Sequence, residues 1–158
     1  MPPGTEHLLE AANVVAGGRA VLEQLAPGKE HVVLAADLDT TLRGLPDGAV
    51  VLASGDPGFF GIVRALSALT DNLVVHPAPS SVALAFARLG VPWDDALVVS
   101  AHGRDPHAAI NAALRHPKVA ILTQPGGAEP IVKALAGRKP VVAQRLGTPL
   151  ERWGHEPP

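Results

Sequence analysis

Gly55, Asp56 and Pro57 stand where an apolar run stops, and they form the first pattern in this sequence that could do chemistry. Glycine lets a ligand approach the backbone closely because it carries no side chain. The carboxylate of Asp56 can accept hydrogen bonds from a ligand, or it can cap a helix whose first turn contains Pro57. Phe60 and Gly61 follow, and in a ligand loop they would form an apolar wall and a gap. The local pattern favours neither interpretation over the other.

A second pattern places two aspartates, Asp37 and Asp39, directly after an apolar run. It resembles the start of the haloacid-dehalogenase-type phosphatases, in which the first aspartate attacks phosphate and the second acts as acid and base, usually with Mg²⁺. Those enzymes have glycine after the second aspartate, where this chain has Thr40. The difference favours the alternative that both aspartates cap a short helix.

Two further loops carry polar side chains directly after apolar runs. Ser80 and Ser81 open a helical stretch, so their hydroxyls predict a turn with a helix cap, or a ligand contact. His102 and Arg104 follow the run 96–101 and are suited to bind an anionic substrate. An ordinary exposed loop would account for this pair equally well.

The elements that must position these residues are short β-branched runs alternating with Ala- and Leu-rich stretches. We expect strands at 31–36, 49–54, 72–76, 96–101, 118–123 and 140–144. We expect helices at roughly 6–13, 18–26, 58–69, 80–89, 106–115 and 127–137. Continuous apolar strands separated by helices predict an α/β fold with βαβ units and a mostly parallel sheet. Ligands of such sheets collect at the carboxyl ends of the strands, where the polar loops fall.

The composition suits one medium domain or two small ones, since the chain has 158 residues of which 47% are hydrophobic. A formal net charge of −2 argues against a general nucleic-acid binder. The absence of cysteine excludes disulfides, thiolate metal sites and cysteine nucleophiles. No apolar run is long enough to span a membrane, and the N-terminus lacks a signal peptide, so we expect a cytoplasmic protein.

A break in the helical pattern near LGVPWDD, residues 89–95, predicts a domain boundary, because Gly90 can end a helix and Pro92 prevents its continuation. The boundary divides the chain into an N-terminal α/β domain, 1–91, and a C-terminal α/β domain, 92–158.

Three segments taken together resemble one family: VLASGDPGFFG (51–61), PAPSSVALAFARLGVPWDDA (77–96) and VVSAHGR (98–104). In this order and spacing they are similar to the tetrapyrrole (corrin) methylases, and most to the branch that methylates carbon 5 of precorrin-6Y or its cobalt form in cobalamin biosynthesis. The resemblance runs from about residue 14 to residue 153. It implies two α/β domains with a cleft between them for the cofactor, S-adenosylmethionine.

The resemblance also implies a site, residue by residue. It places at the cofactor Gly55, Asp56, Pro57, Phe60, Gly61, Ser80, Ser81, Leu122, Thr123, Leu146, Gly147 and Thr148. It assigns His102 and Arg104 to the carboxylates of a precorrin, because a guanidinium pairs well with a carboxylate. The implied reaction is direct methyl transfer without a metal or a protein nucleophile, in which the protein orients two large ligands. No catalytic base is singled out.

The chain departs from the family at both ends. Family members begin with an apolar strand and a glycine-rich loop, whereas MPPGTEHLLE aligns past that loop, so we expect the first strand to be missing. Members also continue beyond ERWGHEPP, so we expect an incomplete C-terminal domain. An inactive fragment is therefore the non-enzyme alternative, beside the Mg²⁺ phosphatase. The family further implies a homodimer and a partner domain that methylates carbon 15 and removes a carboxyl group.

Overall fold

The computed structural model describes residues 2–35 and 37–155. The chain forms two compact units, unit 1 (Met1–Ser80) and unit 2 (Ser81–Pro158). The predicted break after the helix at 80–89 is confirmed, because Gly90 follows α5 (Ser81–Leu89) with a left-handed φ of 64°. A domain boundary between 91 and 92 stays a prediction.

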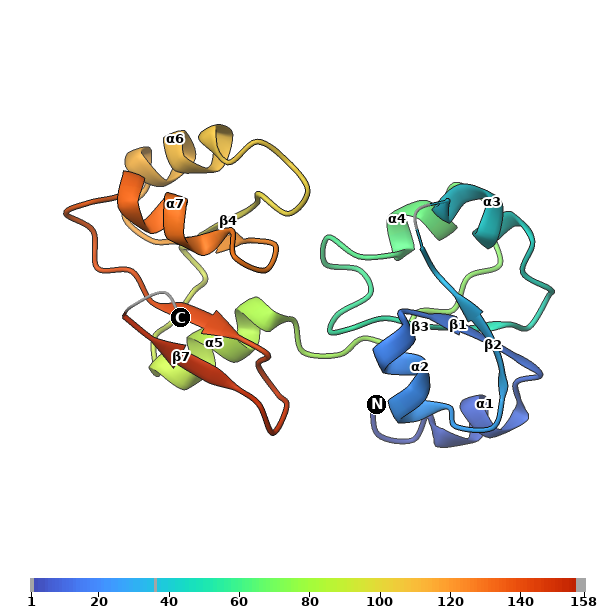
Figure 1. Ribbon diagram of the computed structural model, residues 1–158. Helices are drawn as coiled ribbons and strands as arrows, with labels where there is room; N and C mark the ends of the chain where they lie inside the picture. Colours follow the sequence, from blue (N-terminus) through green and yellow to red (C-terminus); the bar gives the residue numbers. More distant parts are fainter. Residues whose placement is uncertain (1, 36, 156–158) are drawn as a thin grey trace. The chain divides into compact units, whose positions relative to one another are not determined.

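Unit 1 is built around a three-stranded parallel sheet (Figure 1), whose order is β2 (Glu30–Val33), β1 (Val14–Gly17) and β3 (Val50–Leu52). The central strand supplies the core, since Val15 is fully buried and packs with Leu22. The helices of this unit are α1 (Glu6–Ala11), α2 (Arg19–Leu25), α3 (Leu38–Arg43) and α4 (Val63–Leu66).

Unit 2 contains two separate two-stranded sheets. One is parallel, β4 (Leu97–Ser100) with β5 (Val119–Leu122), and the other is the antiparallel hairpin of β6 (Val142–Gln144) and β7 (Arg152–Gly154). Besides α5, its helices are α6 (His107–Arg115) and α7 (Ala128–Ala134). The core joins α6 and α7 to the parallel sheet through Ala101, Ala109, Ala113, Ile131 and Leu135.

The predicted α/β class with parallel strands is confirmed, and two of its details are wrong. Residues 72–76 form no strand, and Val74 is 75% exposed there. Among the described residues β3 pairs with β1 alone, so this apolar segment has gained no strand partner. The helix expected at 58–69 is shortened to Val63–Leu66, and it cannot begin at 58 because Phe60 adopts a φ of 53°, outside the right-handed helical region.

Three elements were not among the expected strands and helices. These are β1, α3 and β7. α3 does match the short helix that the capping interpretation of the two aspartates required. The predicted strand at 31–36 ends in Ala36, which lies outside the described residues, as do 156–158 of the C-terminal segment.

Candidate functional site

The Gly-Asp-Pro loop leaves the sheet of unit 1 at the carboxyl end of β3. Gly55 has a φ of 84°, a left-handed conformation that favours glycine. The Oδ1 atom of Asp56 accepts a hydrogen bond from the backbone N–H of Gly58 at 2.8 Å. Asp56 therefore closes a turn within the loop. Of the two interpretations left open for Asp56, the helix cap is wrong, because α4 begins only at Val63.

The second half of the loop has an unusual backbone. Phe60 is a non-glycine residue in the left-handed region, and its side chain is 51% exposed. Its ring stands edge-on to Phe59, with centroids 5.0 Å apart. A Cβ atom on Gly61 would lie 2.4 Å from the carbonyl oxygen of Pro57, so a side chain there would displace the backbone. Such strain is concentrated at ligand-binding loops, which agrees with the ligand interpretation.

The parallel sheet of unit 2 brings two predicted loops together. Ser100 pairs with Leu122, so the loops that follow β4 and β5 start side by side. The Nδ1 atom of His102 lies 3.3 Å from the carbonyl oxygen of Thr123, a contact whose donor depends on the tautomer. The Arg104 side chain is exposed on the same loop as His102. A residue assigned to the substrate therefore contacts one assigned to the cofactor.

A cavity of about 410 Å³ lies within unit 2 and is lined by α5, α6, β5, α7 and β6 with their adjoining loops. Four of the residues assigned to the cofactor line it: Ser81, Leu122, Thr123 and Leu146. The two hydroxyls stand among apolar side chains from the helices and strands. Its volume and lining match those of small-molecule sites, which measure about 300–1,000 Å³ and combine apolar walls with a few polar groups.

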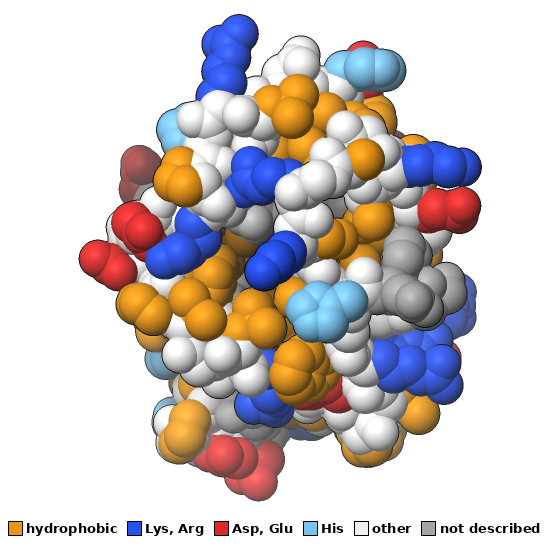
Figure 2. Space-filling view, turned by 90° about the vertical axis from the view of Figure 1, so that its left-hand side faces the viewer, with side chains coloured by type: hydrophobic (Ala, Val, Ile, Leu, Met, Phe, Trp, Pro, Cys, Tyr) orange, Lys and Arg blue, Asp and Glu red, His pale blue; other side chains and the backbone are white. Residues whose placement is uncertain are grey.

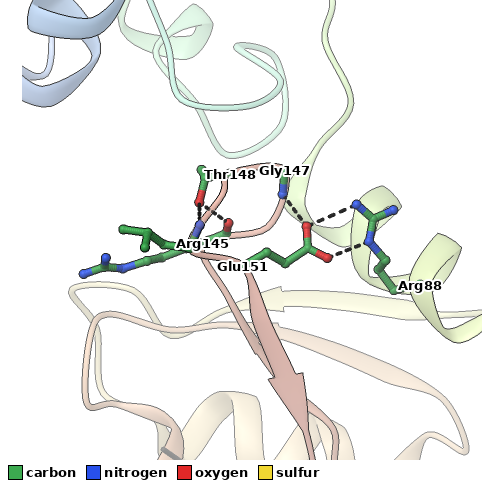
Figure 3. A network of polar contacts seen from close by, with 6 residues as sticks. Arg88, Arg145, Gly147, Thr148 and Glu151 are labelled. Carbon is green, nitrogen blue, oxygen red and sulfur yellow. Dashed lines mark hydrogen bonds and ion pairs between the residues drawn. The ribbon is translucent and has the colours of Figure 1, made fainter.

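The loop between β6 and β7 folds into a hydrogen-bonded turn (Figure 3). Arg145 has a φ of 53°, and its carbonyl accepts hydrogen bonds from the Thr148 hydroxyl at 2.8 Å and from the Thr148 backbone N–H at 3.1 Å. The Glu151 carboxylate accepts the backbone N–H of Gly147 at 2.7 Å. It also accepts two hydrogen bonds from Arg88 on α5, at 2.6 and 3.1 Å.

These contacts keep Glu151 ionised. The hydrogen bonds from Arg88 lower the pKa of Glu151 most, and the Gly147 N–H lowers it further. The sequence analysis missed both Arg88 and Glu151. They lie 63 residues apart, and no local motif links an arginine late in one helix to a glutamate before a distant strand.

The two aspartates of the phosphatase alternative have structural roles in α3. Asp37 caps the helix, accepting the backbone N–H of Thr40 at 3.3 Å, so the capping interpretation is confirmed for this residue. Asp39 lies inside the helix and pairs with Arg43 at 2.8 Å, a hydrogen bond that lowers the pKa of Asp39. The described residues contain no group of three or more His, Cys, Asp or Glu side chains that could hold a metal ion.

The surface is mixed in character. On the face drawn in Figure 2, basic and acidic side chains are interspersed with apolar ones. In the described part of the chain, no helix has the length and hydropathy needed to cross a membrane.

Comparison with known proteins relates the chain to one family. A family model for the Tetrapyrrole (Corrin/Porphyrin) Methylases matches residues 1–156. A precorrin-6Y C(5,15)-methyltransferase [decarboxylating] from Sinorhizobium sp is 40% identical over 129 residues, which cover 75% of this chain and 30% of the relative. A cobalt-precorrin-7 C(5)-methyltransferase from Salmonella typhimurium is 34% identical over 130 residues, covering 78% of this chain and 64% of the relative. The chain thus spans less than two thirds of either relative.

Solved structures show the same fold. The crystal structure of the cobalamin biosynthesis precorrin-6Y methylase (cbiE) from Archaeoglobus fulgidus aligns with a TM-score of 0.68 at 26% identity. That alignment covers 94% of this chain and 78% of the other. The methyltransferase CobJ aligns with a TM-score of 0.71 at 20% identity, over 96% of this chain and 78% of the other, a likeness of fold alone.

Proposed function

The chain belongs to the tetrapyrrole (corrin/porphyrin) methylases, and on that premise we propose that it methylates carbon 5 of a precorrin in cobalamin biosynthesis. The methyl donor in this proposal is S-adenosylmethionine. The relatives named above methylate carbon 5 of precorrin-6Y or of cobalt-precorrin-7, which supports this position on the ring. The proposal assigns to this chain neither the methylation at carbon 15 nor the decarboxylation in the first relative's name.

One observation carries the proposal. Residues assigned to the cofactor from three separate segments, Ser81, Leu122–Thr123 and Leu146, line one cavity of about 410 Å³ in unit 2. Segments so distant in sequence share a cavity only if the fold gathers them. The apolar lining fits an adenine ring, and the hydroxyls of Ser81 and Thr123 can bond to its polar edge or to a ribose.

The family resemblance also assigns the Gly-Asp-Pro loop of unit 1 to the cofactor. Gly55 has the left-handed φ of 84° that favours glycine, and Phe60 offers an exposed aromatic face. We assign Gly55, Asp56, Pro57, Phe60 and Gly61 to cofactor binding, together with Ser80 beside α5 and the turn residues Gly147 and Thr148.

The cofactor supplies an electrophilic sulfonium methyl group when bound. The protein's part is to hold a ring carbon of the substrate in line with that methyl, and such fixed orientation accounts for much of the rate in two-substrate reactions. Arg104 and His102 are assigned to the acidic side chains of the substrate, because both are exposed on the loop after β4. Since His102 contacts Thr123, the loop assigned to the substrate lies beside a residue assigned to the cofactor.

The proposal includes a homodimer and a cytoplasmic location, both of which come from the sequence and the family resemblance. The phosphatase alternative finds no support, since Asp37 and Asp39 serve α3 and the relatives are methyltransferases.

Calorimetric titration of S-adenosylhomocysteine, the demethylated cofactor, tests the proposal. We expect the chain to bind it and a Gly55→Arg variant not to, because a side chain at a φ of 84° strains the loop that is assigned to the cofactor. The Asp37→Asn variant is the control and is expected to bind normally. A folded chain that binds no S-adenosylhomocysteine contradicts the proposal, and so does equal binding by the Gly55→Arg variant.

A further inference from the structure

Two segments assigned to the cofactor, α5 with Ser81 at its start and the turn after β6, are joined to each other within unit 2. The turn packs on α5, since a Cβ atom on Gly147 would lie 3.2 Å from Cδ1 of Leu84. Arg88 stands about two helical turns after Ser81. Its ion pair with Glu151 therefore connects the helix to the far end of the turn (Figure 3).

The carboxylate of Glu151 is used at both oxygens. Oε1 accepts Nε–H of Arg88 at 2.6 Å, and Oε2 accepts both an Nη2–H of Arg88 at 3.1 Å and the backbone N–H of Gly147 at 2.7 Å. The Glu151 side chain is only 17% exposed, against 43% for Arg88. Bidentate pairs of this kind fix the relative orientation of their partners as well as their distance.

The turn has a conformation that needs such support. Arg145 and Gly147 are both left-handed, with φ of 53° and 77°, and Leu146 lies between them. A non-glycine residue in this region is costly and persists only where its surroundings hold it. Leu146 lines the cavity of about 410 Å³. Its position in the cavity wall therefore depends on the conformations of Arg145 and Gly147, which flank it.

We infer that Arg88 and Glu151 are positioning residues, whose ion pair holds the Gly147 amide and thereby sets Leu146 in the wall of the cofactor cavity. Glu151 does not line that cavity and acts through Gly147. The inference rests on the proposed function, because it takes this cavity to be the cofactor's.

The test compares S-adenosylhomocysteine affinity and one NMR signal across variants. Glu151→Ala removes the carboxylate to which both Arg88 and Gly147 donate, and we expect binding to weaken about tenfold or more, as for the loss of charge-assisted hydrogen bonds. Glu151→Gln with its carbonyl at the Oε2 position keeps the bond from Gly147, so its affinity is expected between those of the wild type and the alanine variant. Arg88→Ala is also expected to weaken binding, because the carboxylate loses its anchor on α5.

The amide proton of Gly147 distinguishes positioning from general stability. We expect its NMR resonance to move strongly in Glu151→Ala and to stay near the wild-type position in Glu151→Gln. The control is Asp39→Ala, which breaks another arginine Nε to carboxylate pair, at 2.8 Å in α3, and is expected to change neither readout.

The outcomes separate this inference from the proposed function. If the wild type binds S-adenosylhomocysteine and Glu151→Ala, Arg88→Ala and Asp39→Ala bind it equally well, the positioning role is overturned. The proposed function is then unaffected. An unmoved Gly147 resonance in Glu151→Ala likewise overturns the positioning role. Absence of wild-type binding overturns the proposed function and this inference with it. If Glu151→Ala does not fold, Glu151→Gln and Arg88→Ala carry the comparison.

Discussion

At the residue scale, Gly61 shows how the Gly-Asp-Pro loop depends on a missing side chain. The loop turns back on itself, so that the carbonyl oxygen of Pro57 would lie only 2.4 Å from a Cβ atom on Gly61. Gly58, in the same loop, is different, because its Cβ would meet only Asp56 Oδ1 at 3.4 Å, an ordinary contact. The loop thus offers two glycines with opposite tolerance for alanine.

We expect Gly61→Ala to destabilise the protein by about 1–3 kcal/mol, since the backbone around Pro57 must move to accept the methyl group. The same movement is expected to weaken S-adenosylhomocysteine binding. Gly58→Ala is the matched control and is expected to stay within about 0.5 kcal/mol of the wild type. Urea unfolding of the wild type and the two variants measures the two changes in stability. Equal unfolding midpoints for Gly61→Ala and Gly58→Ala would refute the steric argument.

The glycines of this loop could be predicted from the sequence, and the role of the aspartate could not. Gly55 and Gly61 belong to a motif in which glycine itself indicates a backbone position that does not tolerate a side chain. Asp56 can satisfy a helix or a turn with the same carboxylate, and only the strained Phe60 decides against the helix. The pair of Arg88 and Glu151 depends on how a hairpin packs on α5, which a local pattern does not encode.

At the element scale, most helices and most strands follow from local pattern, and the failure at 72–76 shows why a strand is not a local property. The segment NLVVH has the β-branched composition of a buried strand, yet it lies unpaired with Val74 and Val75 exposed. A strand forms only when a neighbouring edge accepts its hydrogen bonds. Residues 14–17 give the reverse case: they were not predicted as a strand, and they pair on both sides as β1.

The joining of α5 to the β6–β7 hairpin predicts a pH dependence. Because the folded pKa of Glu151 is lowered, its contribution to stability is fully present above the ordinary value of 4.5 and is lost as the pH falls through the lower folded value. Glu151→Gln cannot titrate, so we expect it to lose less stability than the wild type when the pH is lowered below 4.5.

Other carboxylates titrate in the same pH range, so the test compares the free energies of unfolding of the wild type and Glu151→Gln. Both are measured by urea unfolding at a series of pH values. The difference in free energy of unfolding between the wild type and Glu151→Gln is expected to decrease steadily toward acid pH. A difference that stays constant from neutral to acid pH would mean that the ion pair adds nothing to the stability of the folded state.

At the scale of the whole molecule, the chain leaves much apolar surface to be covered. Ten large hydrophobic side chains of the described residues are at least 36% exposed, among them Leu114 at 60% and Trp153 at 49%.

This surface leads us to expect that the chain associates with a second copy, as the family resemblance also implies. Sedimentation equilibrium is expected to give a mass twice that of the 16.2 kDa chain, and S-adenosylhomocysteine is expected to leave that mass unchanged. Closed pairing limits an assembly to two copies, because the two subunits of a symmetric dimer use the same surface. A single-chain mass at every concentration would contradict the expectation. A mass that keeps rising with concentration would contradict it too, since open association leaves apolar surface uncovered at each end.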